Sequence, residues 1–317
     1  MLNFDMLVIP EPNLRATVEM VRFLEAHRFD CAWVADSPPL DWPDVYVSLA
    51  LCSVETSRIH LAPGVTNPVT RHWSVTANAI VTLQRVSGGR ARLGIGFGYS
   101  AVRAAGLKPA RLEELITYVG ALRSVFQERS VSVPIYVAAS GPRALVAAGR
   151  VGDGVMVTVG THPVLVRRAL ELVGRGAAEA GRDPRSVEVV FMAGLAISAD
   201  PAEARREAAP VAARRALDVR YHPAFFVPEE LEHLRADAEQ VARHYDVHRH
   251  SDPDAPHTAL VTDALVDALT LAGTPEQCLT KVRAMEEAGA KRVALFPSGT
   301  DRRGAVELFV AAVLPHL

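Results

Sequence analysis

Residues 59–86 read IHLAPGVTNPVTRHWSVTANAIVTLQRV, a short apolar run followed by a segment with helical spacing. The run Ile59-His60-Leu61-Ala62 is typical of a buried strand. The segment after it carries one apolar stripe, made by Val75, Ala79, Leu83 and Val86. A strand followed directly by an amphipathic helix is the repeating unit of proteins whose parallel sheet is covered by helices. This stretch therefore predicts one β–α unit.

The same unit recurs along the chain. Apolar runs followed by helical sequence predict strands at 4–9, 31–35, 59–62, 91–95, 135–138, 155–159, 187–197 and 293–296. Asn13 is placed to cap the first helix, and Thr274-Pro275-Glu276-Gln277 has the form of a capping box. Eight strand–helix alternations predict a (β/α)8 TIM barrel forming a single domain over residues 1–317, with a doubly wound sheet as the alternative.

Residues 200–272 interrupt this alternation. They show helical periodicity and no convincing strand, so we expect a helical insertion between the seventh strand and the capped helix at 274. An insertion after a barrel strand falls on the C-terminal, catalytic face of the barrel. We therefore expect this segment to act as a lid over the site.

Composition excludes several classes of function. The net charge is −2, from 34 basic and 36 acidic residues, which predicts neither nucleic acid nor an anionic membrane surface as the main partner. No apolar run is long enough to span a membrane. The three cysteines, Cys31, Cys52 and Cys278, are too far apart for a CxxC pair and favour a reducing compartment. We expect a cytoplasmic enzyme that acts on a small molecule.

Two glycine-containing turns are candidate ligand sites. Gly96-Phe97-Gly98-Tyr99-Ser100-Ala101 matches the loose GxGxxA pattern, but that fingerprint belongs at the first strand of a nucleotide-binding unit and this turn follows the fourth. The alternative is a turn that permits close backbone approach. Ser140-Gly141-Pro142 opens a helix after the fifth strand, where it is either an ordinary N-cap or a phosphate site.

Histidines are concentrated in the insertion, at 222, 233, 244, 248, 250 and 257. His244 and His248 have the i, i+4 spacing of two metal ligands on one helix. No HExxH pattern surrounds them, and arginine neighbours His250. We therefore predict a solvated surface and no metal site.

An ordered series of short motifs resembles the luciferase-like monooxygenase superfamily, and most closely its coenzyme F420-dependent methylenetetrahydromethanopterin reductase type. These motifs are Trp33-Val34-Ala35-Asp36, Asp44-Val45-Tyr46-Val47-Ser48-Leu49, Gly64-Val65-Thr66-Asn67-Pro68-Val69-Thr70-Arg71-His72, Ser87-Gly88-Gly89-Arg90, Leu93-Gly94-Ile95-Gly96-Phe97-Gly98, Pro134-Ile135-Tyr136-Val137-Ala138-Ala139-Ser140-Gly141-Pro142 and Gly152-Asp153-Gly154-Val155. The resemblance covers most of residues 1–200 and resumes at Gly273. It implies the barrel fold, a deazaflavin cofactor and a homodimer.

The resemblance also implies where the cofactor lies. It places the ring beside Asp36 and against Gly64 and Val65, which would be joined by a cis peptide bond and followed by Thr66 and Asn67. It places Gly96 and Gly98 at the border of the ring. The phosphate-bearing tail would bind at Ser140 and Gly141 and near Val159 and Gly160.

Two positions depart from the family pattern. Ser37 stands where histidine usually follows the aspartate, and Tyr99 stands where aspartate often follows the glycines. A serine cannot act as an imidazole acid, so we expect a substrate other than methanopterin, with methanopterin itself as the alternative. The candidate proton donors or hydrogen-bonding groups are Glu11, Asp36, Ser37 and Tyr99.

The expected function is a coenzyme F420-dependent oxidoreductase that transfers hydride between the deazaflavin and a C=N or activated C=C bond. The protein would position the ring and shield it from water. One alternative is a monooxygenase that uses FMN on the same barrel. The other is a non-catalytic flavin- or deazaflavin-binding protein, since the histidine is missing.

Overall fold

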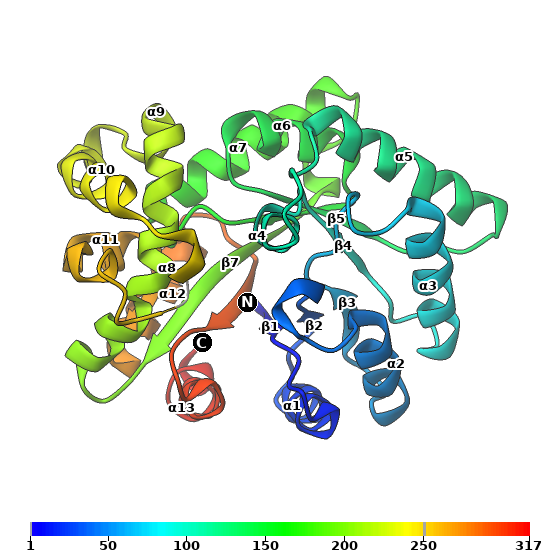
Figure 1. Ribbon diagram of the computed structural model, residues 1–317, viewed down its shortest axis with the longest axis horizontal. Coiled ribbons are helices and arrows are strands. Elements are labelled where there is room, and N and C mark those ends of the chain that lie inside the picture. The colour runs from blue at the N-terminus through cyan, green and yellow to red at the C-terminus, as the bar shows by residue number, and fades with distance from the viewer. Residues whose placement is uncertain (1, 250–251) are drawn as a thin grey trace.

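The computed structural model describes residues 2–249 and 252–317 and contains a parallel barrel surrounded by helices (Figure 1). Neighbouring strands follow the order β3-β2-β1-β9-β7-β6-β5-β4. Single parallel bridges, Leu61 to Ala91 and Thr66 to Ile95, join β3 to β4 and nearly close the sheet. The strands are β1 (Asn3–Val8), β2 (Cys31–Val34), β3 (His60–Pro63), β4 (Leu93–Ile95), β5 (Ile135–Ala139), β6 (Gly154–Val157), β7 (Glu188–Ile197) and β9 (Arg292–Pro297). The predicted TIM barrel is thus confirmed.

The helices that cover the barrel alternate with these strands. They are α1 (Leu14–Ala26), α2 (Val45–Glu55), α3 (Trp73–Val86), α4 (Tyr99–Ala104), α5 (Leu112–Glu128), α6 (Pro142–Val151), α7 (Pro163–Glu179), α12 (Pro275–Glu287) and α13 (Arg302–Ala312). The predicted caps are present: Asn13 Oδ1 accepts from the Arg15 amide at 3.2 Å, and Gln277 Oε1 accepts from the Thr274 amide at 2.9 Å. None of the helices in the described part of the chain is both long and apolar enough to cross a membrane.

The chain between β7 and the capped helix α12 is mainly helical, but it ends in a strand that we did not predict. Its helices are α8 (Pro201–Tyr221), α9 (Pro223–Phe226), α10 (Arg235–His244) and α11 (Asp263–Leu269), and they gather on one side of the barrel (Figure 1). Residues Leu271–Gly273 form strand β8, which pairs in parallel with β7. The expectation of no strand in 200–272 was wrong here because three residues are too few to show a periodicity.

Strand residues alternate between the inside of the barrel and the layer under the helices. In β2, Cys31 and Trp33 pack with interior residues, whereas Ala32 and Val34 belong to the outer core. Both faces are apolar because a parallel sheet covered by helices is buried on both sides. The interior below Trp33 is polar: Trp33 Nε1 donates to Asp5 Oδ2 at 2.8 Å, and Arg292 Nη1 contacts Asp5 Oδ1 at 2.8 Å. Side-chain packing therefore fills the barrel, and ligands are left with its C-terminal end.

Candidate active site at the C-terminal ends of the strands

The loops that follow β2, β3 and β4 converge at one end of the barrel. The Gly64 amide donates to Val34 O at 2.6 Å, and the amide of Gly96 donates to Thr66 O at 2.9 Å. These backbone bonds hold the three strand ends side by side. They bring together four buried polar side chains that we had selected from the sequence, namely Asp36, Ser37, Thr66 and Asn67.

The peptide bond between Gly64 and Val65 is cis, as the resemblance predicted. Only glycine fits at position 64, because a Cβ atom there would lie 2.6 Å from Trp33 Cβ. Gly98 has φ of +76° and packs on the same loop, since a Cβ at this position would come within 2.9 Å of Asn67 Cγ. The glycines of the GxGxxA-like stretch therefore permit close packing between the ends of β3 and β4.

Buried polar atoms at this end of the barrel lack partners. Seven side chains each have one buried nitrogen or oxygen with no hydrogen-bond partner among the described residues: Asp36, Ser37, Tyr46, Thr66, Asn67, Thr70 and Arg71. Buried polar groups in folded proteins are nearly always hydrogen-bonded. So many unsatisfied atoms in one place indicate that a polar ligand completes the site. We call these seven residues the polar cluster.

Asp36 is the carboxyl group of the polar cluster. Burial raises its pKa above the usual value for aspartate, while the Thr66 hydroxyl and Arg71 act in the opposite direction. The Thr66 hydroxyl is close enough to lower the pKa of Asp36 by hydrogen bonding, but its contact with the carboxyl lacks full hydrogen-bond geometry. Arg71 Nε lies 3.9 Å from Asp36 Oδ2. Desolvation therefore outweighs both favourable interactions and favours the protonated form.

Arg71 and Tyr46 are two members of the polar cluster that sequence reasoning missed. Arg71 donates from Nη2 to Asp44 Oδ2 at 2.5 Å, and its guanidinium carbon lies 4.9 Å from the centre of the Tyr46 ring. Tyr46 belongs to α2 and Arg71 to the loop before α3. Arg71 lies within the motif Gly64–His72 that carries the family resemblance, but nothing in its own spacing marked it as a site residue.

The other two catalytic candidates have different surroundings. The side chain of Glu11 is exposed, and its backbone amide donates to Thr17 Oγ1 at 2.8 Å. Tyr99 is the first residue of α4 and is partly buried. Its ring contacts two guanidinium groups, from Arg103 at 4.3 Å and from Arg214 of α8 at 4.7 Å. Tyr99 thus links the β4 loop to the helical layer after β7.

The residues proposed for a phosphate-bearing tail lie at the ends of β5 and β6. Gly141 is the N-cap of α6, with Pro142 in the first turn. A Cβ at Gly141 would lie 2.6 Å from His222 Nε2, so the imidazole rests directly on this helix N-terminus. Val159 is buried, and Gly160 has φ of +103° and packs on the backbone of α11. His222 is exposed, as predicted for the histidines of this segment, but the sequence did not show that α8 ends beside α6. The prediction was wrong for His257, which is fully buried because it packs on Tyr245.

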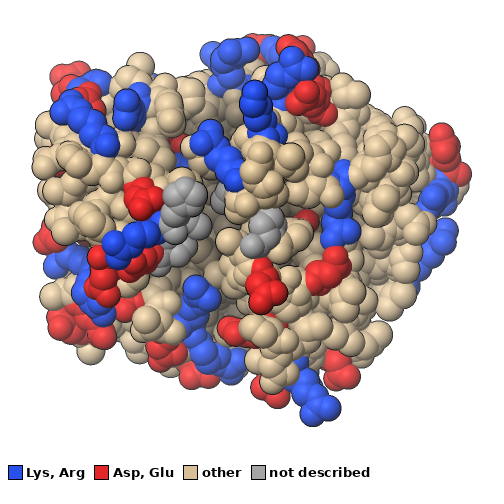
Figure 2. Space-filling view, in the orientation of Figure 1, with Lys and Arg blue, Asp and Glu red and all other residues tan. Residues whose placement is uncertain are grey.

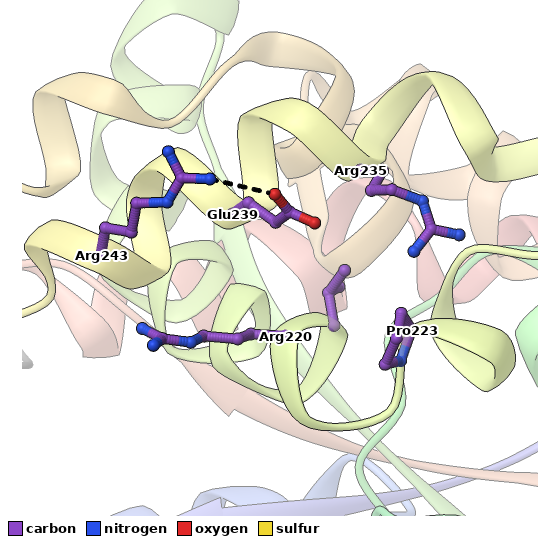
Figure 3. A pocket seen from close by; sticks show the side chains of 6 residues that line it. Arg220, Pro223, Arg235, Glu239 and Arg243 are labelled. Atoms are coloured by element: carbon purple, nitrogen blue, oxygen red, sulfur yellow. Dashed lines mark hydrogen bonds and ion pairs between the residues drawn. The ribbon is translucent and has the colours of Figure 1, made fainter.

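A separate cavity of about 280 Å³ lies between α8, α9 and α10 (Figure 3). It is lined by Val219, Arg220, Pro223, Arg235, Glu239 and Arg243. Arg243 pairs with Glu239 at 3.2 Å, and Arg235 pairs with Glu232 at 2.5 Å. None of the site residues selected from the sequence lines this cavity, so it is distinct from the polar cluster.

Metal ligands were not expected. Within residues 2–249 and 252–317, no group of three or more His, Cys, Asp or Glu side chains is arranged to hold a metal ion. Helix α10 ends at His244, so His244 and His248 do not share a helix. His250 lies outside the described residues.

Comparisons with known proteins agree with this architecture. A model of the luciferase-like monooxygenase family matches residues 3–292. The 5,10-methylenetetrahydromethanopterin reductase of Methanolobus tindarius is 30% identical over 97% of this chain and 98% of its own. The F420-dependent glucose-6-phosphate dehydrogenase of Nocardia farcinica is 27% identical over 96% of this chain and 94% of its own.

The solved structure of the coenzyme F420-dependent tetrahydromethanopterin reductase from Methanopyrus kandleri has a TM-score of 0.78 to this chain. It covers 99% of both chains at 24% identity, which is evidence for the fold alone. The family model, by contrast, spans most of the sequence, from the first strand to the start of the last. The chain therefore belongs to the luciferase-like monooxygenase family.

Proposed function

We propose that this protein is a coenzyme F420-dependent oxidoreductase that reduces a C=N or activated C=C bond of a small molecule. The observation that carries the proposal is the polar cluster, whose buried and unsatisfied atoms lie where a TIM barrel binds its ligands. The relatives with names that specify F420 or methylenetetrahydromethanopterin reduction support this choice of cofactor and reaction. A bound deazaflavin supplies or accepts a hydride.

The residues of the polar cluster fit such a group chemically. Thr66 and Asn67 offer an unsatisfied hydroxyl and an unsatisfied amide nitrogen beside the backbone at Gly64 and Val65. We assign them, with Gly96 and Gly98, to the binding of the cofactor ring. Asp36 and Ser37 stand next to them and have polar atoms left for the substrate or the ring. A buried aspartate with a raised pKa is suited to hold a proton and donate it to the reduced substrate.

The tail of the cofactor would extend toward β5 and β6. In this proposal the backbone amides at Ser140 and Gly141 bind its phosphate, because free amides at a helix N-terminus favour an anion. His222 lies against Gly141 and adds a donor there. Val159 and Gly160 would border the same part of the cofactor. Residues 200–272, which contain His222, would form a lid within one domain that spans residues 1–317.

The decisive test is a titration of the apoprotein with F420 and with FMN. We expect tighter binding of F420; FMN affinity about tenfold or more higher would favour an FMN-dependent monooxygenase, the second candidate suggested by the family description. The reduced deazaflavin should then be oxidised by an imine or enone substrate. Binding without turnover of any such substrate would favour a non-catalytic binding protein, consistent with Ser37 in place of histidine.

We also propose that the protein is a homodimer that pairs through α2 and α3. Helix α2 exposes an apolar stripe, Val47, Leu51 and Val54, with exposed fractions of 54%, 41% and 66%. Val75 and Val86 of the adjacent α3 are each 52% exposed. Exposed apolar side chains gathered on neighbouring helices are typical of an interface. Light scattering should give twice the chain mass, and Val54→Glu should give monomers; a monomeric wild type would refute the dimer.

The remaining features suit a cytoplasmic enzyme of small molecules. The three cysteines are free and buried, as expected in a reducing compartment. Acidic and basic side chains are interspersed over the face drawn in Figure 2. Such a mixed surface supports our expectation that neither nucleic acid nor a membrane is a partner.

A further inference from the structure

Two arginines contact Tyr99, and a third arginine follows one of them on α8. Arg103 of α4 and Arg214 of α8 both contact the Tyr99 ring, at 4.3 Å and 4.7 Å from its centre. Arg215 follows Arg214 on α8, and its Nη1 donates to Thr158 O, just beyond β6, at 2.9 Å. The three guanidinium groups are therefore held between the β4 loop, α8 and the end of β6. Tyr99 contacts cations from two separate elements.

Positive charge in this group exceeds negative charge. Asp218 pairs with Arg215 at 2.9 Å and with Arg214 at 3.4 Å. No ion pair joins Arg103 to a carboxylate within the described chain, and its side chain is exposed. Two guanidinium groups thus share one carboxylate and the third has none. This leaves an excess charge of about +2, because arginine stays protonated at every physiological pH.

A buried hydroxyl group adds a donor to this arrangement. Tyr245 follows α10, and its hydroxyl is buried without a hydrogen-bond partner among the described residues. Arg214, Arg215 and Tyr99 are among the charged and titratable groups that influence it electrostatically. Buried polar groups are nearly always hydrogen-bonded, so this hydroxyl is available to donate to an acceptor atom of a ligand.

The arginine group borders the polar cluster. Gly98, which precedes Tyr99, packs on Asn67, and α4 packs against the 3₁₀ turn Pro38–Leu40 that follows Ser37. Figure 2 shows both basic and acidic side chains around the middle of the drawn face. In Figure 1, α4 lies in front of the barrel between α8 and the strands that carry the polar cluster.

We propose that Tyr99, Arg103, Arg214 and Tyr245 form a subsite for a carboxylate or phosphate group of the substrate. This inference rests on the proposed function, since it assigns the substrate class of that same site. Guanidinium groups bind both anions through paired hydrogen bonds, and a tyrosine hydroxyl donates one more. The enzyme would thus select anionic small molecules, with the anion at Tyr99 and the reacting bond near Asp36.

The test uses inorganic phosphate as the probe, titrated into the full-length protein with and without saturating F420. We expect Arg103→Gln and Arg214→Gln each to weaken phosphate binding about fivefold or more. The phosphate affinity is measured by calorimetry or from the arginine Nε–H signals in NMR. Arg185→Gln is the matched control, because the Arg185 side chain is 89% exposed and, within the described residues, forms an ion pair only with Asp183. Equal phosphate affinity in the wild type and both site variants would overturn the proposal.

Two further measurements separate the possible explanations. Arg103→Gln alters an exposed side chain, so it remains informative if Arg214→Gln loses stability together with its contact to Asp218. F420 and the same deazaflavin without its phosphate-bearing tail are then compared. If Arg214→Gln weakens binding of only the complete cofactor, the anion belongs to the tail and the substrate assignment is wrong. If F420 does not bind at all while phosphate binds at the arginines, the proposed function fails and the anion subsite stands.

Discussion

Arg71 Nε lies 3.9 Å from Asp36 Oδ2, beyond hydrogen-bonding distance, while the other end of the same guanidinium binds Asp44 at 2.5 Å. The pKa values of Asp36 and Asp44 are shifted in opposite directions. Hydrogen bonds from Arg71 and from backbone amides lower the pKa of Asp44 despite its partial burial, whereas burial raises the pKa of Asp36. Arg71 thus holds positive charge near Asp36 without neutralising the effect of burial.

Replacing Arg71 should therefore raise the pKa of Asp36 further. If protonated Asp36 is the acid in the proposed reaction, activity falls as pH rises through this pKa, because the proton is lost. In Arg71→Met that decline should occur at higher pH than in the wild type, whereas Arg71→Lys should resemble the wild type. The pH dependence of kcat/KM in the wild type and in the two variants gives these apparent pKa values. An unchanged or lower apparent pKa in Arg71→Met would contradict this role.

Asp36→Asn should reduce turnover much more than cofactor binding. The amide has nearly the same volume but cannot donate a proton as an acid, so we expect kcat to fall about 10²-fold or more while F420 affinity changes about threefold or less. Asp41→Asn is the control, because Asp41 is exposed and has φ of +57°, a conformation that asparagine also adopts. A loss of binding as large as the loss of turnover would make Asp36 a cofactor ligand instead.

Gly98→Ala should destabilise the protein more than Gly106→Ala. Both glycines have positive φ, +76° and +72°, so both variants incur a backbone cost of about 1–2 kcal/mol. A methyl group at Gly98 also meets Val102 and Asn67, at 2.3 Å and 2.9 Å, whereas nothing lies within 4 Å of the Gly106 position. Urea unfolding should show an additional loss of about 1–3 kcal/mol for Gly98→Ala. Equal losses of unfolding free energy in the two variants would show that the added methyl group at position 98 does not clash with Val102 and Asn67.

The barrel could be predicted because each β–α unit has its own local pattern. The run at 31–35 is apolar on both faces and became Cys31–Val34, and the helix capped at Asn13 begins one residue later. Strand β8 was missed because Leu271–Gly273 is too short to be distinguished from the helix before it. Its existence depends on tertiary pairing with β7.

The site was predictable only where its residues follow a strand directly. The family resemblance had placed Asp36, Thr66 and Asn67 at the cofactor ring and marked Ser37 beside them. Their positions just after β2 and β3 explain why they lie together. Tyr46 and Arg214 reach the site from helices, and helical periodicity does not specify which barrel loop a helix end will contact. The cis bond at Gly64 and Val65 followed from the family resemblance and not from any local preference.

The lid proposal concerns the segment around Tyr221–Pro228. His222 within it rests on Gly141, the proposed phosphate site, so cofactor binding should order this segment. Hydrogen exchange should show increased protection there on addition of F420, with little change in α12 as an internal control. Equal protection with and without F420 would show that the segment is a fixed part of the structure and does not act as a lid. The lid prediction also covers His248–Pro256, but this segment contains residues 250 and 251, which lie outside the described residues.

The interior ion network should give the protein a specific dependence of stability on pH. Asp5 is fully buried, and burial raises its pKa from 3.8 to about 6 despite its contacts with Arg292 and Trp33. A raised pKa means that folding favours the protonated form, so this stabilising contribution is complete below about pH 4 and is lost as pH rises through 6. Glu188, which also contacts Arg292, has a lowered pKa and makes the opposite contribution, present above its unfolded pKa and lost in acid.

Two variants separate these contributions. The unfolding free energy of the wild type minus that of Asp5→Asn should decrease between pH 4 and 6, by on the order of 2 kcal/mol. The same difference for Glu188→Gln should increase with pH below its unfolded pKa, because the lost carboxylate was stabilising only when ionised. Urea unfolding at a series of pH values measures both differences. Parallel pH dependences in the two variants would mean that Asp5 is held ionised by Arg292 throughout, and that burial does not control its protonation.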